Sequence, residues 1–187
     1  MRAALYSGPQ DLKVVEVDTP KINGKELLIK VKACATCGTD AKIFNHGHPR
    51  LKPPMIIGHE IAGEIVEIGS EVSGFKNGDR VQVIAAIPCG TCWACKAGKM
   101  QICINQLSMG YQFPGGFAEY MVAPKEQVFS AKGMHPDVAV LTEPTACVVH
   151  GMDILKPKPG SRALVFGAGP TGLILAQLLA TSPDMNV

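Results

Sequence analysis

Five short stretches of the chain alternate apolar and polar side chains, which is the pattern of strands with one buried face. The clearest runs from Glu26 to Ala33, where every second residue is apolar. The others are Leu12 to Val17, Ile61 to Ile68, Val81 to Ile87 and Phe117 to Val122. Turn residues separate them, among them Gly24, Asn77-Gly78-Asp79 and Gly115-Gly116. Short strands joined by such turns predict a mainly β chain folded as a compact barrel.

The pattern changes toward the C-terminus. Asp137 to Leu155 contains few turn residues and predicts a helix broken around Glu143-Pro144. A linker containing Pro157, Pro159 and Gly160 follows. The remaining elements are a strand over Arg162 to Phe166, a glycine turn and a helix over Thr171 to Ala180. A strand, a glycine turn and a helix in this order predict the opening of a βαβ unit.

One segment has the composition of a membrane span. Ala163 to Pro183 contains no charged residue. Gly167, Gly169, Pro170 and Gly172 interrupt it near its centre, which leaves a short strand-like piece and one helix-sized piece. We therefore expect no membrane-spanning helix there.

Charge and composition exclude some classes of function. The 187 residues carry a formal net charge of +2, with lysine and arginine spread along the chain, which gives no basic footprint for nucleic acid or a membrane surface. Small-molecule partners are favoured. The first ten residues lack the apolar stretch of a signal peptide, so we expect a cytoplasmic protein.

The seven cysteines favour metal binding over disulfides, because their number is odd and several stand two residues apart. Cys89, Cys92, Cys95 and Cys103 are close enough for one loop to wrap a tetrahedral Zn²⁺ with all four positions filled by protein. A filled shell predicts a structural site. Lys96 and Lys99 offset part of the thiolate charge. Two alternatives remain open, namely surplus cysteines in a loop and an iron–sulfur cluster.

Further motifs occur outside this cluster, and each alone is weak. They are Cys37-Gly38-Thr39-Asp40, Gly58-His59-Glu60 followed by Ile61-Ala62-Gly63, Gly116-Phe117-Ala118-Glu119-Tyr120, Glu143-Pro144 and Gly167-Ala168-Gly169-Pro170-Thr171-Gly172. Together with the four-cysteine cluster, and in this order, they resemble the zinc-containing medium-chain dehydrogenases, on the side of the polyol (sorbitol-type) and threonine dehydrogenases. The resemblance covers essentially the whole chain.

The resemblance implies a second, catalytic zinc held by Cys37, His59 and Glu60, with Glu143 as a carboxylate that exchanges with water. The alternative for Glu143 is a charge at a helix terminus. The open zinc position then binds the substrate alcohol and lowers its pKa before hydride passes to the nicotinamide. Cys34 and Cys147 match positions that are not ligands, and we interpret both as packed core thiols.

Thr39 resembles the hydroxyl that accepts the alcohol proton. The family commonly has a histidine where this chain has Lys42, so the proton route beyond Thr39 stays open between a lysine relay and a solvated lysine. We interpret His46 and His48 as surface loop residues, because Gly47 and Pro49 flank them.

Gly167, Gly169 and Gly172 form a G-x-G-x-x-G loop that the pattern places between a strand and a helix, as dinucleotide binding requires. A plain strand-turn-helix is the alternative. Asp184 comes too early to be the acidic residue that recognises a ribose, so NAD and NADP cannot be told apart. We expect a GroES-like zinc-binding catalytic domain over residues 1–156. Residues 157–187 then begin an incomplete α/β Rossmann domain.

The sequence therefore predicts a zinc-dependent oxidoreductase that transfers hydride from an alcohol or polyol to NAD(P)+. We expect the chain to be a fragment, inactive alone, of a homo-oligomeric enzyme. A threonine-type or simple alcohol dehydrogenase is an alternative, and so is a non-catalytic zinc-binding module. A zinc-ribbon nucleic-acid binder lacks the basic and aromatic surface it would need.

Overall fold

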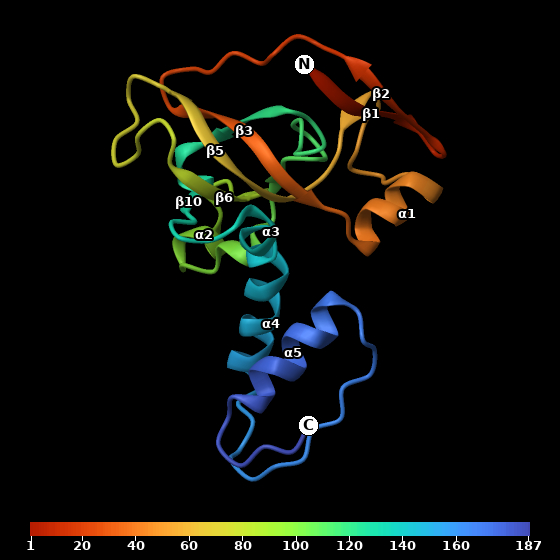
Figure 1. The fold of residues 1–187 in the computed structure, drawn as a ribbon, viewed down its shortest axis with the longest axis vertical. Helices are drawn as coiled ribbons and strands as arrows, with labels where there is room; N and C mark the ends of the chain where they lie inside the picture. Colours follow the sequence, from red (N-terminus) through yellow and green to blue (C-terminus); the bar gives the residue numbers. More distant parts are fainter. The chain divides into compact units, whose positions relative to one another are not determined.

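Antiparallel β-sheets build the first part of the chain in the computed structural model, which describes residues 1–187 (Figure 1). A five-stranded sheet has the order β10 (Val128–Ser130), β6 (Arg80–Ile84), β5 (Glu60–Ile68), β3 (Glu26–Ala35) and β9 (Tyr120–Pro124). A three-stranded sheet has the order β2 (Asp11–Glu16), β1 (Arg2–Gly8) and β4 (Met55–Ile56). The strands β7 (Ala86–Ile87) and β8 (Leu107–Ser108) pair separately. The chain divides into two compact units, Met1–Val140 and Leu141–Val187, and all these sheets belong to the first.

The core of the first unit lies on one face of the five-stranded sheet. Leu27 and Ile29 of β3 are fully buried, and they pack with Ile61, Ile65 and further apolar residues of β5, β6 and β9. The alternation predicted from Glu26 to Ala33 is confirmed at Leu27, Ile29 and Val31, which face this core. It is wrong at Ala33, which packs against a separate cluster that contains Ala62 and Ala139. Register shifts in the β3–β5 pair after Leu28 and after Val31 mark irregularities in the ladder.

Most predicted strands are present, with altered ends. Val81 to Ile87 forms two strands, β6 and β7, rather than one. The strand predicted from Phe117 begins only at Tyr120, because Phe117 to Glu119 bonds to β1 through single contacts, including an isolated bridge between Ala3 and Ala118. The expected closed barrel is not formed. The two larger sheets are joined at this bridge and not by a continuous ladder.

Three helices and two 3-10 turns complete the first unit. The helices are α1 (Gly38–His46), α2 (Trp93–Lys96) and α3 (Pro136–Ala139). The 3-10 turns are η1 (Met100–Ile102) and η2 (Lys125–Gln127). Helix α1, which the sequence pattern did not reveal, begins directly after β3 and buries Ile43 in a second apolar cluster with Tyr6, Leu51 and Ile57.

The second unit consists of α4 (Thr142–Leu155), α5 (Pro170–Ala180) and connecting segments. The predicted helix break falls at Val140–Leu141 rather than at Glu143-Pro144. Pro144 lies in the first turn of α4, where its missing N–H removes no helical hydrogen bond. The helix predicted from Thr171 is confirmed as α5.

The strand predicted over Arg162 to Phe166 is not formed. Its backbone makes one isolated bridge, between Arg162 and Asn186, and a strand needs a continuous hydrogen-bonded partner. Leu164 and Phe166 are 78% and 90% exposed. The start of a Rossmann sheet is therefore not evident in this unit.

Pro136–Leu155 is a helical stretch of 20 residues that is apolar and long enough to cross a membrane, judged by length and composition alone. This is weak evidence, because core helices of soluble proteins pass the same test. The stretch is also divided between α3 and α4 and contains Glu143 and Asp153. In the segment from Ala163 to Pro183, α5 has 11 residues, fewer than the roughly 20 that a crossing needs.

Candidate functional site

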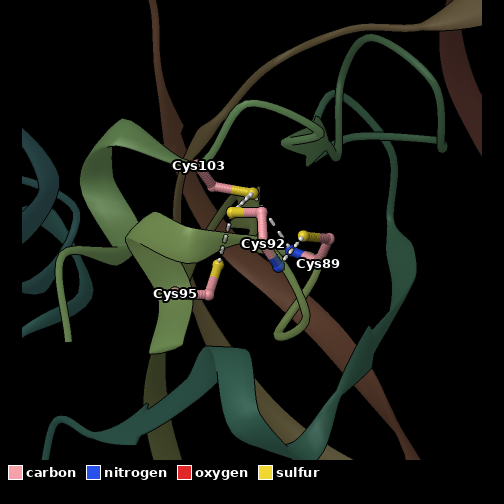
Figure 2. A group of neighbouring side chains, drawn as sticks. All are labelled: Cys89, Cys92, Cys95 and Cys103. Atoms are coloured by element: carbon pink, nitrogen blue, oxygen red, sulfur yellow. Dashed lines mark hydrogen bonds between the residues drawn. The ribbon is translucent and has the colours of Figure 1, made fainter. Parts of the chain in front are cut away.

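The four cysteines converge in the lobe between β7 and β8, which we call the cysteine lobe (residues 88–106). Cys89 and Cys92 precede α2, Cys95 lies within it, and Cys103 follows η1. The sulfur of Cys92 lies 3.6 Å from that of Cys95 and 3.9 Å from that of Cys103. All four sulfurs lie within 4.8 Å of one another, with those of Cys92, Cys95 and Cys103 drawn side by side in Figure 2.

Backbone amides of the lobe point at these sulfurs. The N–H of Cys89 donates to the Cys103 sulfur over 3.3 Å, and the N–H of Cys92 donates to the Cys89 sulfur over 3.4 Å. Hydrogen bonds from the amide and hydroxyl of Thr91 and from the Cys92 amide lower the pKa of Cys89 to about 5. Desolvation and the neighbouring thiols raise the pKa of Cys95 to about 12.

This arrangement fits a zinc ion. Zn–S bonds of about 2.3 Å place the sulfurs of a tetrahedron about 3.8 Å apart. The Cys92–Cys95 and Cys92–Cys103 distances are close to that value. Four protein ligands leave no position for a substrate, so the cluster is of the structural type.

A second group of metal-binding side chains forms where α1 begins. Cys37 is the N-cap residue of α1, and its sulfur accepts the Thr39 amide N–H over 3.3 Å. The Asp40 carboxylate accepts the Cys37 amide N–H over 2.9 Å, which completes a capping box. The Cys-Gly-Thr-Asp motif therefore starts a helix and fixes the Cys37 sulfur and the Asp40 carboxylate at the same end.

His59 stands between these two groups. Its Nε2 lies 3.1 Å from the Cys37 sulfur, and its Nδ1 lies 3.5 Å from Oδ1 of Asp40. Asp40 is 3% exposed, and the His59 side chain is 14% exposed. A carboxylate behind one ring nitrogen holds the proton there and leaves the other nitrogen to a metal. Cys37 and His59 thus present one sulfur and one nitrogen in a pair that suits zinc.

Gly58 determines how the chain reaches His59. Its φ is +95°, and a Cβ there would lie 2.6 Å from the Phe117 ring and 2.9 Å from the Cys34 sulfur. Glycine is therefore required at this position for backbone conformation and for space. Phe117 and Cys34 support the turn that aims His59 at Cys37.

The predicted site residues are only partly brought together. The compact group contains Cys37, Asp40 and His59, whereas the Glu60 carboxylate lies outside it. Glu60 is buried at the start of β5. Glu143 lies on α4 in the second unit, beside the Cys147 sulfur at 4.0 Å. Zinc ligation by Glu60 and by Glu143 stays a prediction.

Sequence reasoning missed the part played by Asp40, although its position three residues after the N-cap Cys37 is a capping-box signal.

The interpretation of Cys34 as a packed thiol is confirmed, since Cys34 packs against the main core and burial raises its pKa to about 12. The same interpretation of Cys147 is wrong, because Cys147 lies on the exposed face of α4. Lys42 is exposed, and His46 is the exposed last residue of α1.

The glycine loop lies in the second unit and leads into α5, with Gly169 as the N-cap residue. Gly167 has a φ of +102°, and a Cβ on Gly172 would lie 2.1 Å from the Gly167 carbonyl oxygen. The loop is therefore a tight turn that needs glycine at both positions. Free N–H groups at the start of a helix suit a pyrophosphate.

Known dehydrogenases match most of this chain. The alcohol dehydrogenase GroES-like domain family matches residues 23–133. D-arabinitol dehydrogenase 1 of Uromyces fabae is 43% identical over 187 residues, which are 100% of this chain and 53% of that protein. L-threonine 3-dehydrogenase of Pyrococcus horikoshii is 43% identical over 166 residues, 87% of this chain and 47% of that protein.

The fold has counterparts among solved structures. A thermostable alcohol dehydrogenase from Pyrobaculum aerophilum, solved with cobalt and zinc bound, matches this chain with a TM-score of 0.89 and 30% sequence identity. The match covers 99% of this chain and 58% of the Pyrobaculum chain. The chain spans about half the length of the curated relatives it matches. It belongs to the zinc-dependent medium-chain alcohol and polyol dehydrogenase family, of which it represents the N-terminal half.

Proposed function

We propose that the protein containing this chain is an oxidoreductase that uses zinc to transfer hydride from an alcohol or polyol to NAD(P)+. The observation that carries the proposal is the pairing of the Cys37 sulfur with His59 Nε2 at 3.1 Å, backed by the Asp40 carboxylate. Family members are zinc- and NAD(P)-dependent dehydrogenases, which supports the same function.

In this proposal Cys37, His59 and Glu60 would hold the catalytic zinc, and Glu143 would be a carboxylate that exchanges with water. Bound zinc acts as a Lewis acid that lowers the pKa of the substrate hydroxyl. Asp40 holds the His59 tautomer. The Thr39 hydroxyl accepts the alcohol proton. Relatives commonly have a histidine at the position of Lys42. Because Lys42 is exposed, we propose that the proton passes from Thr39 to solvent and not to a buried histidine.

Residues 157–187 are proposed to begin the dinucleotide-binding domain, after a catalytic domain over residues 1–156. Gly167, Gly169 and Gly172 would receive the pyrophosphate at the start of α5. The exposed apolar side chains of Leu164, Phe166 and Leu173 support this assignment, because a two-layer domain would bury them against further strands and helices. The whole enzyme is proposed to be homo-oligomeric and cytoplasmic.

The relatives divide over the substrate. An arabinitol dehydrogenase points to a polyol, and a threonine dehydrogenase points to an amino alcohol. Both kinds of substrate carry a hydroxyl next to a second polar group. A polyol is our first choice, because the polyol dehydrogenase matches 100% of this chain and the threonine dehydrogenase matches 87%.

The test is oxidation of D-arabinitol, L-threonine and 1-propanol by the full-length protein, with NAD+ and with NADP+. We expect nucleotide reduction that depends on zinc and is lost in Cys37→Ser. Unchanged turnover in a folded Cys37→Ser protein would remove Cys37 from the catalytic site. A protein that binds zinc and reduces neither nucleotide would favour the non-catalytic zinc module.

A further inference from the structure

The cysteine lobe buries little of its own chain. Only Ala94 and Cys103 are buried within it, whereas Trp93 and Ile104 are 62% and 65% exposed. Its helical structure is limited to α2, with four residues, and η1, with three. A segment with so small an apolar core gains its folding free energy from a bound metal. Metal in the four-cysteine cluster is therefore expected to order the lobe.

The end of the lobe leads to the backbone next to His59. Strand β8 pairs with β7 through only two residue pairs and then enters a turn formed by residues 109–116. This turn lies on Gly58, because the Gly116 amide N–H donates to the Gly58 carbonyl over 3.0 Å. A Cβ on Gly115 would lie 2.2 Å from the same carbonyl oxygen. The turn therefore packs against the peptide that leads into His59.

The lobe is also tied to the loop that follows α1. The Arg50 guanidinium in this loop donates to the carbonyl of Gln106, the last residue of the lobe. The side-chain amide of Gln112, in the 109–116 turn, donates to the Arg50 carbonyl over 2.7 Å. Helix α1 itself begins at its N-cap residue Cys37. The lobe is therefore bonded to the segment that carries Cys37 and continues into the turn that lies on Gly58.

We propose that the 109–116 turn and Arg50 couple the two metal groups, so that metal in the cysteine lobe strengthens metal binding by Cys37 and His59. An ordered lobe fixes both ties, and the ties hold the Gly58 backbone and the loop after α1 in place. Metal ligation tolerates deviations of only about 0.2 Å in ligand distance, so small shifts at Gly58 lower the affinity. The coupling deepens the proposed function and rests on it, because it requires a metal at each group.

The coupling is reciprocal, because a free energy that links two binding sites acts equally in both directions. Metal at Cys37 and His59 should therefore raise the zinc affinity of the lobe by the same factor. Couplings between binding sites commonly change an affinity by about fivefold or more. An effect of this size is measurable by competition with a chelator.

The test measures the Co²⁺ affinity of the Cys37–His59 group by visible absorption, with a competing chelator and with zinc in the lobe. In the comparison chain, Cys92→Ser/Cys95→Ser removes two lobe ligands and thereby the lobe metal. We expect Co²⁺ to bind this variant about fivefold more weakly than the wild type. In the reverse direction, Cys37→Ser should lower the zinc affinity of the lobe by the same factor.

Gly110→Ala tests the link with all four cysteines in place. Gly110 has a φ of +82°, and a Cβ there would lie 3.0 Å from the Gly58 carbonyl oxygen. The variant should retain the lobe zinc and bind Co²⁺ about fivefold more weakly. Gly133→Ala is the matched control, because Gly133 has a φ of +83° with open space around its Cβ. It introduces the same backbone strain and should keep the wild-type Co²⁺ affinity.

Arg50→Ala removes the tie to Gln106. It should lower the Co²⁺ affinity by less than Gly110→Ala does, because the contact of the turn with Gly58 remains. Lys52→Ala is its control, since Lys52 is an exposed cation of the same loop, and it should leave the affinity unchanged.

Wild-type Co²⁺ affinity in both Gly110→Ala and Arg50→Ala, with zinc still in the lobe, would overturn the coupling and leave the proposed function standing. An equal loss of affinity in Gly110→Ala and Gly133→Ala would also overturn it. These outcomes hold even if the Cys92→Ser/Cys95→Ser chain does not fold. If the wild type binds no Co²⁺ at Cys37 and His59, the proposed metal site fails, and the coupling fails with it.

Discussion

The cysteine lobe and the Cys37–His59 group both present zinc-binding side chains, and they differ in how the chain assembles them. The four cysteines lie within 15 consecutive residues, and the local turns of that lobe bring their sulfurs together. Cys37, Asp40 and His59 meet only because β3 and β5 share the main core, while α1 and the turn before β5 meet in the second apolar cluster. A local cluster can be recognised from spacing alone, whereas a dispersed one depends on the whole fold.

The two groups also differ in what their ligands leave open. The lobe offers four sulfurs, which complete a tetrahedral shell. Cys37 and His59 bring two ligand atoms together, which leaves positions at the same ion for further groups. The difference predicts that changes in the lobe alter stability and that changes around His59 alter exchangeable metal.

The largest effect is expected from the lobe. Cys103→Ser removes a buried ligand, and loss of the structural metal should lower the free energy of unfolding by about 4 kcal/mol. Urea unfolding and zinc analysis measure this, and Cys147→Ser is the control because Cys147 is exposed. A Cys103→Ser chain with wild-type stability would show that the four-cysteine cluster does not stabilise the fold.

The next effect concerns the turn before His59. Gly58 has a φ of +95°, and the Cβ of an alanine there would lie 2.6 Å from the Phe117 ring. Gly58→Ala should therefore lower the free energy of unfolding by about 3 kcal/mol and release the metal at the Cys37–His59 group. Gly74→Ala has a similar φ of +88° with no atom near its Cβ, and should cost only about 1 kcal/mol. Equal losses in the two variants, measured by urea unfolding, would contradict the close packing around Gly58.

A smaller effect is expected from Asp40, which orients the ligand His59 and is not itself assigned as a ligand. Asp40→Asn should weaken metal affinity at the open group about 10- to 100-fold, because the His59 ring loses the carboxylate that orients it. Competition with a coloured chelator measures the affinity, and the four-cysteine metal should stay in place. Unchanged affinity at the open group would mean that Asp40 acts only as the cap of α1.

The smallest effect is a pH dependence. Burial raises the pKa of Cys34 from 9.0 to about 12, so the folded state holds this proton more tightly than the unfolded state does. The resulting stability is present below pH 9 and is lost as the pH rises from 9 toward 12. Cys34→Ala should flatten the fall of the urea midpoint over this interval. A parallel fall in both proteins would assign it to other groups.

Periodicity predicted the main elements of the sheet, because Leu27 and Ile29 face the core as the pattern requires. It missed α1, since the Cys37–Asp40 capping box is recognised only once the sulfur is seen to act as a cap. It placed a strand over Arg162 to Phe166, where no partner strand is present. Apolar sequence alone does not form a strand.

The metal-binding residues, like the secondary structure, could be predicted only in part from the sequence. Spacing identified the four cysteines, and the resemblance pointed to Cys37 and His59. The place of Asp40 beside His59 could not be predicted, because the start of α1 and the turn before β5 meet only in the folded chain.

The two groups of side chains predict two metal sites of different kinds. The decisive measurement is the zinc content of the purified chain, followed during treatment with a chelator. We expect two zinc ions per chain, one removed readily from Cys37 and His59 and one retained by the four cysteines. A single, tightly held zinc ion would show that Cys37 and His59 do not form a metal site.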